Sequence, residues 1–388
     1  MNVHLIVGAR PNFMKAAPII EAARQHKEKI SCYLIHTGQH YDAVMSKLFF
    51  EDLGLPKPDI YLGIGSGTHA EQTARVMVEL EKIFVRERPD LVMVLGDVNS
   101  TMAGALAASK LCIPVAHIEA GLRSFDREMP EEINRLVTDS ISDYLFTTCQ
   151  EADTNLLKEG HPADHIFMVG NVMIDSLLKS QKASDSSRIL DRLFLRQNGP
   201  VSAYSVLTLH RPSNVDDKDT LLDIFEALRI LAKDSLMIFP VHPRTRKQIE
   251  SFGMTSLFNV LDADADNGTR YKKPVLDKIN CTMPLGYLDF IKLLSHARLV
   301  LTDSGGIQEE TTIMKVPCLT LRHNTERAIT VREGTNLLVG NNKQKIIAGA
   351  HSQLKKDFSR IKAPKYWDGK AAERIIAVLN DFFNRITV

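Results

Sequence analysis

The sequence predicts an α/β protein made of two domains, each with a doubly wound parallel β-sheet. Short runs rich in Val, Ile and Leu alternate with longer amphipathic segments, a pattern typical of parallel strands that helices cover on both faces. The alternation stops at a polar stretch, residues 179–193, and then begins again. The length of 388 residues fits two domains of ordinary size, and an apolar content of 44% can supply a core for each.

Six strands are expected in the first half of the chain, each a short apolar run. They are residues 3–7, 32–36, 91–95, 114–118, 144–146 and 166–170. Between most of these runs apolar residues recur every three or four positions, most clearly in residues 70–87 and 100–111, which predicts helices there. We therefore expect a first domain over residues 1–171.

Five more strands are expected in the second half. They are residues 204–209, 236–241, 297–301, 316–321 and 336–340. These runs predict a second domain over residues 172–365, with the linker near residues 171–184. The pattern of residues 369–386 predicts an amphipathic helix that could belong to either domain.

The composition argues against several kinds of partner. The 48 basic and 47 acidic residues nearly balance, which gives no reason to expect nucleic acid or a membrane surface. The five cysteines form no C-x-x-C pair, so neither a zinc site nor a redox motif is indicated. The start of the sequence lacks the features of a signal peptide, and no apolar run approaches the ~20 residues of a membrane helix. We expect a cytoplasmic protein.

Acidic residues gather at the predicted strand ends of the first domain. Ligands of open α/β sheets bind outside the carboxyl ends of the strands. There the sequence places Asp97 in GDVNST, Glu119 in HIEAGLRS, and Glu131 and Glu132 in PEEINR. Burial and mutual repulsion would raise the pKa values of these carboxylates, which suits proton transfer to and from carbon. A metal site and plain structural turns are the alternatives, although the spacing matches no known metal-binding loop.

A glycine pair marks a strand end of the second domain. In TDSGGIQEE the glycines enter a helix, so backbone N–H groups at the helix N-terminus can approach a phosphate. The alternative is a plain strand–turn–helix in which Ser304 caps the helix. Glu310 lies about one turn into the helix, where its carboxylate could accept hydrogen bonds from a ribose diol.

Basic residues follow other predicted strands. In the second domain they are His210 and Arg211 in LHRPSN, His242 in HPRT and Arg327 in TERAIT. Several basic loop ends on one sheet edge suit a diphosphate, and a histidine can protonate a leaving group near neutral pH. In the first domain, Arg10 and Lys15 in GARPNFMK are further possible anion contacts, but this motif lacks G-x-G-x-x-G and does not indicate a dinucleotide. Two such edges facing each other would form one interdomain cleft.

The ordered motifs identify a family resemblance. GARPNFMK, TGQH, GDVNST, HIEAGLRS, PEEINR, LHRPSN, HPRT, TDSGGIQEE and TERAIT resemble, in this order, the motifs of the UDP-N-acetylglucosamine 2-epimerase family. The resemblance spans residues 3 to about 340. It implies two Rossmann-like domains, as in the GT-B glycosyltransferases, with the substrate in the cleft between them. It also implies a C-terminal helix, residues 366–388, that returns to the first domain.

The resemblance implies an activity as well. The family inverts C2 of UDP-GlcNAc to give UDP-ManNAc, a precursor of surface polysaccharides, without a redox cofactor and without a metal. UDP leaves by anti elimination to form 2-acetamidoglucal, and it then adds back with protonation on the opposite face. The first domain would act on the sugar, and the second would bind UDP. A homodimer is expected from the resemblance alone.

The resemblance assigns roles to residues by motif. The catalytic set implied is Asp97, Glu119, Glu131 and His210. The substrate contacts implied are Arg10, Lys15, Arg135, Arg211, His242, Ser304, Gly305, Gly306, Glu310 and Arg327. Some family members also bind a second UDP-GlcNAc as an activator, and the candidate positions for it are Gln39, His40 and Gln72.

Three departures from the family pattern leave the precise substrate open. GDVNST replaces the commoner Gly-Asp-Thr-Thr-Ser, Ala328 stands where a proline usually follows the arginine, and residues 262–273 look like an insertion. The alternatives are a 2-epimerase of a UDP-2,3-diacetamido uronic acid, a hydrolysing epimerase, a glycosyltransferase of the same architecture and a sensor that binds a nucleotide sugar. GARPNFMK favours the non-hydrolysing branch of the family.

Overall fold

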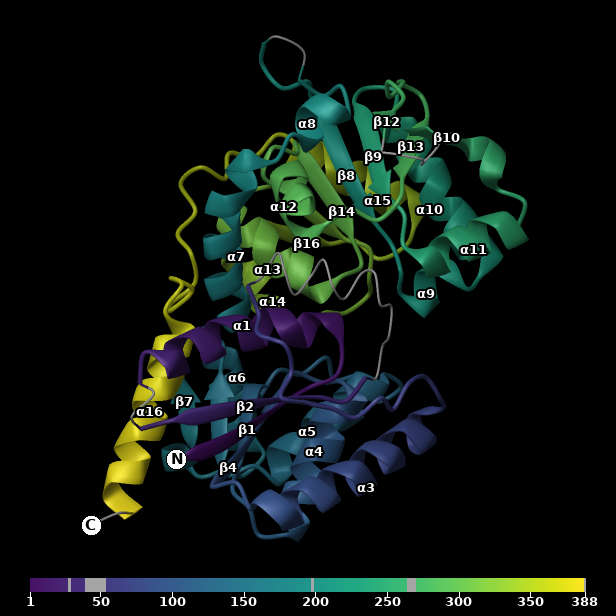
Figure 1. Cartoon of the computed structure of the whole chain (residues 1–388). Helices are drawn as coiled ribbons and strands as arrows, with labels where there is room; N and C mark the ends of the chain where they lie inside the picture. The colour runs from purple at the N-terminus through teal and green to yellow at the C-terminus, as the bar shows by residue number, and fades with distance from the viewer. Residues whose placement is uncertain (27–28, 39–53, 197–198, 264–269, 387–388) are drawn as a thin grey trace. The chain divides into compact units, whose positions relative to one another are not determined.

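The protein forms two compact units (Figure 1). The computed structural model describes residues 1–26, 29–38, 54–196, 199–263 and 270–386. The first unit consists of Met1–Lys179 with Pro364–Val388, and the second unit of Ser180–Ala363. The boundary expected at residue 171 precedes helix α7, Val172–Ala183, whereas the first unit continues to Lys179.

A parallel sheet of seven strands forms the centre of the first unit, in the order β3-β2-β1-β4-β5-β6-β7. The strands are β1 (Asn2–Val7), β2 (Ser31–His36), β3 (Ile60–Tyr61), β4 (Leu91–Leu95), β5 (Val115–Ala120), β6 (Tyr144–Thr147) and β7 (Ile166–Met168). All neighbouring strands pair in parallel, so their carboxyl ends lie at one edge. The strand order reverses between β1 and β4, and such a switch point is where open α/β sheets bind ligands.

Helices cover both faces of this sheet, with α3, α4 and α5 on one face and α1 on the other (Figure 1). The helices are α1 (Arg10–Arg24), α3 (His69–Glu87), α4 (Asn99–Lys110), α5 (Pro130–Ser140), α6 (Gln150–Lys158), α7 and α16 (Ala371–Ile386). Helix α3 begins with a capping box between Thr68 and Glu71. Its buried residues Val76, Leu80 and Ile83 recur every three or four positions, which places one apolar face against the core.

The last helix, α16, packs in the first unit beside α1 (Figure 1). The carboxylate of Asp175 accepts hydrogen bonds from the backbone N–H groups of Ala371 (3.2 Å) and Ala372 (2.8 Å) at the helix N-terminus. Just before the helix, the indole N–H of Trp367 donates to the backbone carbonyl of Thr148 (3.0 Å). Helix α1, helix α7 and the loop that contains Thr148 are far apart in the sequence, and all three contact the C-terminal segment.

The second unit repeats this architecture with a parallel sheet in the order β10-β13-β9-β8-β14-β15-β16. The strands are β8 (Tyr204–Thr208), β9 (Leu236–Pro240), β10 (Phe258–Val260), β13 (Ile279–Thr282), β14 (Leu299–Thr302), β15 (Cys318–Thr320) and β16 (Asn336–Leu338). The helices are α8 (Ile189–Arg192), α9 (Pro212–Val215), α10 (Lys218–Leu231), α11 (Pro243–Ser251), α12 (Tyr287–Ser295), α13 (Gly305–Met314), α14 (Ala328–Arg332) and α15 (Lys343–Gln353). The switch point lies between β8 and β14.

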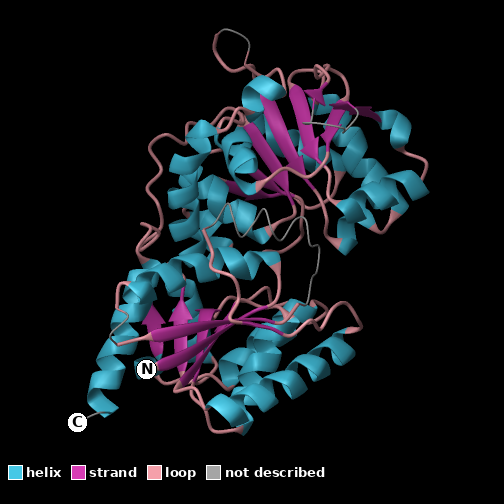
Figure 2. Cartoon of the chain, in the orientation of Figure 1, coloured by secondary structure: helices cyan, strands magenta, loops and turns pink. Residues whose placement is uncertain are grey.

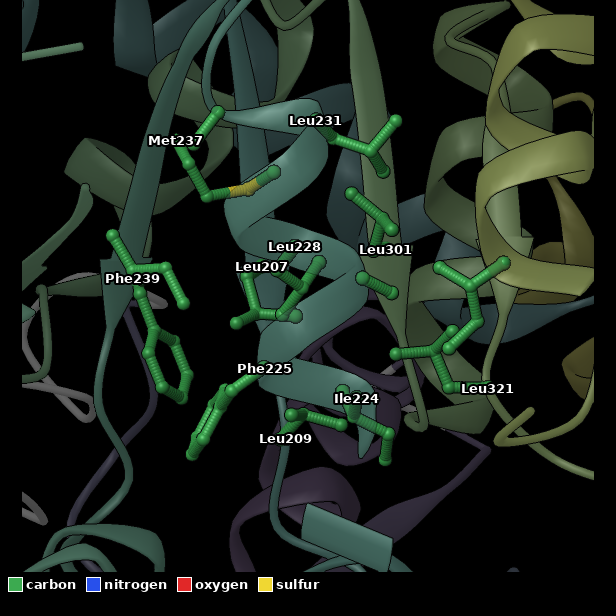
Figure 3. Packing of buried hydrophobic residues seen from close by; sticks show 14 of the residues in the cluster. Leu207, Leu209, Ile224, Phe225, Leu228, Leu231, Met237, Phe239, Leu301 and Leu321 are labelled. Carbon is green, nitrogen blue, oxygen red and sulfur yellow. The ribbon is translucent and has the colours of Figure 1, made fainter. Parts of the chain in front are cut away.

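Alternation along the strands divides the core of the second unit into two layers. Leu207 and Leu209 point to one face, where they pack with α10 residues such as Ile224 (Figure 3). Tyr204 and Val206 belong to the cluster on the opposite face. Because successive side chains of a strand point to opposite faces, an apolar strand can fill both layers, as expected for a parallel sheet.

The predicted fold class, two doubly wound parallel sheets, is confirmed (Figure 2). The predicted strand list is incomplete, because β3, β10, β11 (Asp262–Ala263), β12 (Arg270–Tyr271) and β13 were not expected. The ends of the expected insertion, residues 262–273, form a short antiparallel pair of β11 and β12. Among the residues that the structure describes, none of the helices is long and apolar enough to span a membrane.

Candidate active site

A buried ion pair joins Lys15 and Glu119 at the switch point of the first unit. Lys15 comes from α1, Glu119 from β5, and each residue is only 5% exposed. Glu119 has a φ of 76°, a left-handed conformation that is rare for a residue with a side chain, at a register shift between β5 and β6. Gly96, after β4, has a φ of 65°, and a Cβ there would lie 2.5 Å from Lys15 Nζ. The ends of α1, β4 and β5 therefore converge on this pair.

A second buried cluster holds Asp97, which follows Gly96. The Arg135 guanidinium lies 2.5 Å from Asp97 Oδ2 and 2.6 Å from Glu132 Oε2. Glu132 also accepts the backbone N–H groups of Ser124 (3.0 Å) and Phe125 (2.9 Å). Although burial alone would raise it, the Ser124 N–H and Arg135 hold the pKa of Glu132 below its ordinary value. Glu132 is therefore an ionised group that orients Arg135.

A chain of amide side chains connects Asp97 to α3. Asn134 donates to the backbone carbonyl of Asp97 (2.9 Å) and to Asn99 Oδ1 (3.3 Å). Asn99 in turn donates to Gln72 Oε1 (2.9 Å), and Gln72 donates to the backbone carbonyl of Gly65 (3.0 Å). Gln72 is thus buried beside the site edge, whereas Gln39 and His40 lie outside the described residues.

A fully buried histidine, His117, binds the backbone just after β4 at the same edge of the sheet. His117 Nδ1 lies 2.6 Å from Asp139 Oδ1, and its Nε2 lies 2.8 Å from the backbone carbonyl oxygen of Gly96. Asp139 also binds Arg123 (2.7 Å). Burial opposes ionisation of Asp139, but His117 and Arg123 hold its pKa below the ordinary value. The sequence does not single out these residues, because their roles depend on contacts between distant segments.

The corresponding edge of the second unit carries two histidines, His210 and His242. Their ring centroids lie 5.6 Å apart. His210 Nδ1 lies 3.0 Å from Asp303 Oδ1, and the His210 side chain is 38% exposed. His242 Nδ1 accepts the backbone N–H of Arg244 (3.2 Å), so His242 caps α11.

The N-terminus of α13 lies beside a cluster of buried charges. The N-cap residue, Ser304, makes no side-chain capping hydrogen bond. Glu309 lies 3.1 Å from Arg327 Nε, and Glu326 forms a second ion pair with Arg327. A Cβ at Gly305 would lie 2.8 Å from Arg327 Cζ, so the absence of a side chain at Gly305 lets the guanidinium reach the helix N-terminus. The guanidinium and the helix N-terminus together favour an anion.

Comparison with known proteins decides the family. The family model described as UDP-N-acetylglucosamine 2-epimerase matches residues 22–380. The chain belongs to this family. As an epimerase, it is an isomerase. One relative, the UDP-N-acetylglucosamine 2-epimerase of Methanocaldococcus jannaschii, is 46% identical over 98% of this chain and 99% of its own length. The UDP-2,3-diacetamido-2,3-dideoxy-D-glucuronate 2-epimerase of Pseudomonas aeruginosa is 42% identical over 98% of this chain and 99% of its own.

Solved structures of family members show the same fold. The M. jannaschii enzyme in complex with UDP-GlcNAc and UDP has a TM-score of 0.86 and 46% identity, over 98% of this chain and all of the other. The Neisseria meningitidis enzyme bound to UDP-GlcNAc has a TM-score of 0.84 and 30% identity, over 98% of this chain and all of the other. These similarities confirm the predicted fold class, two Rossmann-like domains of the GT-B type.

Most of the predicted epimerase residues lie at or after the carboxyl ends of the strands of their own unit. In the first unit these are Lys15, Asp97, Glu119 and Arg135, and in the second unit His210, Arg211, His242, Ser304, Gly305, Gly306, Glu310 and Arg327. Glu131 lies half-buried in the first turn of α5, next to the fully buried Glu132. Arg10 begins α1, but its side chain lies outside the described residues.

The expectation of raised carboxylate pKa values in this epimerase is wrong for Glu132. Mutual repulsion was expected to raise their pKa values, but Glu119 is paired with Lys15 and Asp97 with Arg135. The pKa of Glu132, which also binds Arg135, is lowered. Lys15 of α1 and Arg135 of α5 therefore balance the negative charges of these carboxylates. Lys15 stands in the motif GARPNFMK and Arg135 in PEEINR, but their pairing with these acids was not predicted.

Glu310 behaves differently from the acids of the first unit, because it is buried with little compensation. Burial raises the pKa of Glu310 to about 8, although the hydroxyl of Tyr287 donates to its Oε1 (3.3 Å). Glu309, its neighbour, raises the pKa further. In the free enzyme at neutral pH, the Glu310 carboxyl is mostly protonated, so it can both donate and accept a hydrogen bond.

The free energy of unfolding is expected to fall as pH rises from about 4.5 to about 8, by as much as about 5 kcal/mol from Glu310 alone. Over this range the unfolded chain releases the Glu310 proton while the folded chain keeps it. The stabilisation is full below the unfolded pKa and is lost as pH rises through the folded pKa. Glu310→Gln should remove this dependence, which urea unfolding at several pH values measures.

The matched control is Glu250→Gln, at an exposed position of α11 in the same unit. It should unfold with the pH dependence of the unaltered protein. Equal pH dependence in Glu310→Gln and the unaltered protein would contradict the assignment of a raised pKa to Glu310.

Proposed function

We propose that this enzyme interconverts UDP-N-acetylglucosamine and UDP-N-acetylmannosamine by inversion at C2, as a non-hydrolysing epimerase. The observation that carries the proposal is the buried Lys15–Glu119 pair at the switch point of the first unit. A contacting ammonium favours the ionised carboxylate, which can accept a proton. The UDP-GlcNAc and UDP in the structures of family members support the substrate class.

The proposed reaction is an anti elimination followed by re-addition. A carboxylate of the first unit, from Asp97, Glu119 or Glu131, takes the C2 proton, and the C–H electrons form the C1=C2 bond of 2-acetamidoglucal. The C1–O bond breaks, and its electrons leave with the β-phosphate oxygen of UDP. UDP then adds back at C1, while C2 receives a proton on the opposite face. No net oxidation occurs, so the cycle needs no redox cofactor.

The second unit is proposed to hold UDP through the whole cycle. The N-terminus of α13 and Arg327 bind the diphosphate, Glu310 binds the ribose, and His210 donates a proton to the leaving oxygen. The His210 proton makes UDP a better leaving group. Firm binding of UDP keeps it available for re-addition.

The acidic partners of Arg327 limit its role. Glu309 and Glu326 already pair with it, so its net charge near the helix N-terminus is compensated in the free enzyme. Arg327 therefore contributes directed N–H donors more than free charge, which suits selective binding of a diphosphate.

A second candidate substrate is a UDP-2,3-diacetamido uronic acid. The P. aeruginosa relative named for this substrate class is 42% identical to the chain, close to the 46% of the M. jannaschii UDP-GlcNAc enzyme. The homodimer, the cytoplasmic location, the role in surface polysaccharide synthesis and the activator site at Gln39, His40 and Gln72 stay predictions.

The deciding experiment is incubation with UDP-GlcNAc in heavy water, followed by proton NMR. UDP-ManNAc should appear, and deuterium should enter C2 of both sugars. The assay is repeated with added UDP-GlcNAc analogue as activator and with the diacetamido uronic acid substrate. Absence of both the product and the exchange from UDP-GlcNAc, with exchange only in the uronic acid, would replace the first candidate by the second. Acceptor-dependent UDP release without exchange would instead indicate a glycosyltransferase.

A further inference from the structure

Asp303 makes an unusual set of contacts at the end of β14. It is fully buried, and it lies directly before Ser304 in the motif that enters α13. One carboxylate oxygen accepts the backbone N–H groups of His210 (3.0 Å) and Arg211 (2.8 Å). The other accepts the same His210 N–H at 3.2 Å and lies 3.0 Å from Nδ1 of the His210 ring. Asn214 donates to the first oxygen (3.3 Å). One side chain therefore fixes both the loop after β8 and the ring that the loop carries.

The contacts of Asp303 favour its ionised form. Burial opposes ionisation, but His210 and the two backbone N–H groups lower the pKa of Asp303 below its ordinary value. An ionised carboxylate can only accept hydrogen bonds. The His210 nitrogen that faces it, Nδ1, must therefore carry a proton.

The position of this proton determines what the rest of the His210 ring can do. With Nδ1 protonated, the neutral ring has its lone pair on Nε2 and can accept a proton there. The protonated ring can donate from the same atom. The carboxylate holds the orientation of the ring, as the buried aspartate does in the Ser-His-Asp triad.

We propose that Asp303 is a positioning residue that fixes the tautomer and the orientation of His210, so that Nε2 exchanges a proton with the departing and returning UDP oxygen. The expected effect on kcat rests on the proposed function. The assignment of the His210 tautomer does not. In the elimination, the Nε2–H bond breaks and the proton passes to the UDP oxygen as the C1–O bond breaks. In the re-addition, Nε2 takes the proton back as the C1–O bond forms.

Asp303→Asn is the informative variant, because the amide has the size of the carboxylate but one acceptor fewer. Its oxygen should take the position that receives the N–H groups of His210, Arg211 and Asn214, where three donors converge. Its NH₂ group then faces His210 Nδ1 and can only donate, so the neutral ring must place its proton on Nε2. In that tautomer Nε2 has no lone pair, and its N–H is a far weaker acid than an imidazolium.

The tautomer is measured directly, with ¹⁵N-histidine NMR of the neutral ring at alkaline pH. His210→Gln identifies the His210 signals among those of the 13 histidines. The unaltered enzyme should show Nδ1–H, and Asp303→Asn should show Nε2–H. In the same variant kcat should fall about 10²-fold or more, while KM for UDP-GlcNAc changes less than about threefold. A merely structural role would not move the tautomer.

Asn214→Ala is the matched control. Asn214 binds the same carboxylate and the backbone carbonyl of Leu321 (2.8 Å), and neither hydrogen bond involves the His210 ring. It should lower the midpoint of thermal unfolding and keep the Nδ1–H tautomer. An unchanged tautomer in Asp303→Asn, or a kcat loss as large in Asn214→Ala as in Asp303→Asn, would overturn the proposal. If the unaltered enzyme turned over no UDP-sugar, the proposed function would fail, and the tautomer alone would decide the role of Asp303.

Discussion

Glu119→Gln is expected to lower kcat for epimerisation by about 10³-fold, within the range for loss of a general base. Glu119 is buried in contact with Lys15, and its left-handed backbone fixes where the carboxylate points. Glutamine has nearly the same size, but its amide cannot take the C2 proton. The affinity for UDP should not change, because the UDP contacts are proposed in the second unit. NMR of the sugar gives kcat, and titration calorimetry gives the affinity.

The control for this variant lies in the loop that follows β5. Glu128 is exposed, and it stands between Glu119 and α5 in the sequence. Glu128→Gln should keep kcat within about twofold of the unaltered enzyme. A kcat within about tenfold in Glu119→Gln would remove Glu119 from the proton-transfer set.

The fold could be predicted because parallel strands leave a strong signal. Runs buried on both faces are continuously apolar, so strands such as β4 and β8 were expected within one or two residues of their ends. β13 was missed because Asn280 interrupts its run. In the folded chain, Asn280 Oδ1 accepts the backbone N–H of Val275 (2.9 Å), and its NH₂ donates to the Val275 carbonyl (2.9 Å). A loop outside the strand thus satisfies a buried polar residue, and local sequence cannot show this.

The sequence predicts which motifs contribute to the candidate site, but it does not predict which side chains bind one another there. Asp303 and Glu132 both stand in motifs that carry the family resemblance, yet their roles depend on His210 and Arg135. Glu131 and Glu132 precede Arg135 by four and three positions, and either spacing can place a carboxylate beside it on the helix surface. The structure shows that Glu132 does so. The pattern PEEINR alone does not distinguish the two.

Arg135→Ala is expected to destabilise the first unit by about 3–5 kcal/mol, the usual cost of removing one partner of a buried ion pair. The Arg135 side chain is 2% exposed and pairs with Asp97 and Glu132, whose side chains are 28% and 2% exposed. Without Arg135, the charge of Glu132 is buried and uncompensated. Asp97 also loses the group that orients it, so kcat should fall about 10²-fold or more. Urea unfolding measures the first effect, and the NMR assay measures the second.

A second substitution separates the two effects. In Arg135→Ala, the added change Glu132→Gln removes the buried charge, and the amide oxygen can still accept the N–H of Ser124 or Phe125. The double variant should therefore recover about 1–3 kcal/mol of the lost stability. Its kcat should stay low, because Asp97 remains without Arg135. A double variant less stable than Arg135→Ala would show that the Glu132 carboxylate stabilises the loop by itself. Recovery of kcat together with stability would show that Arg135 supports the fold and takes no part in orienting Asp97.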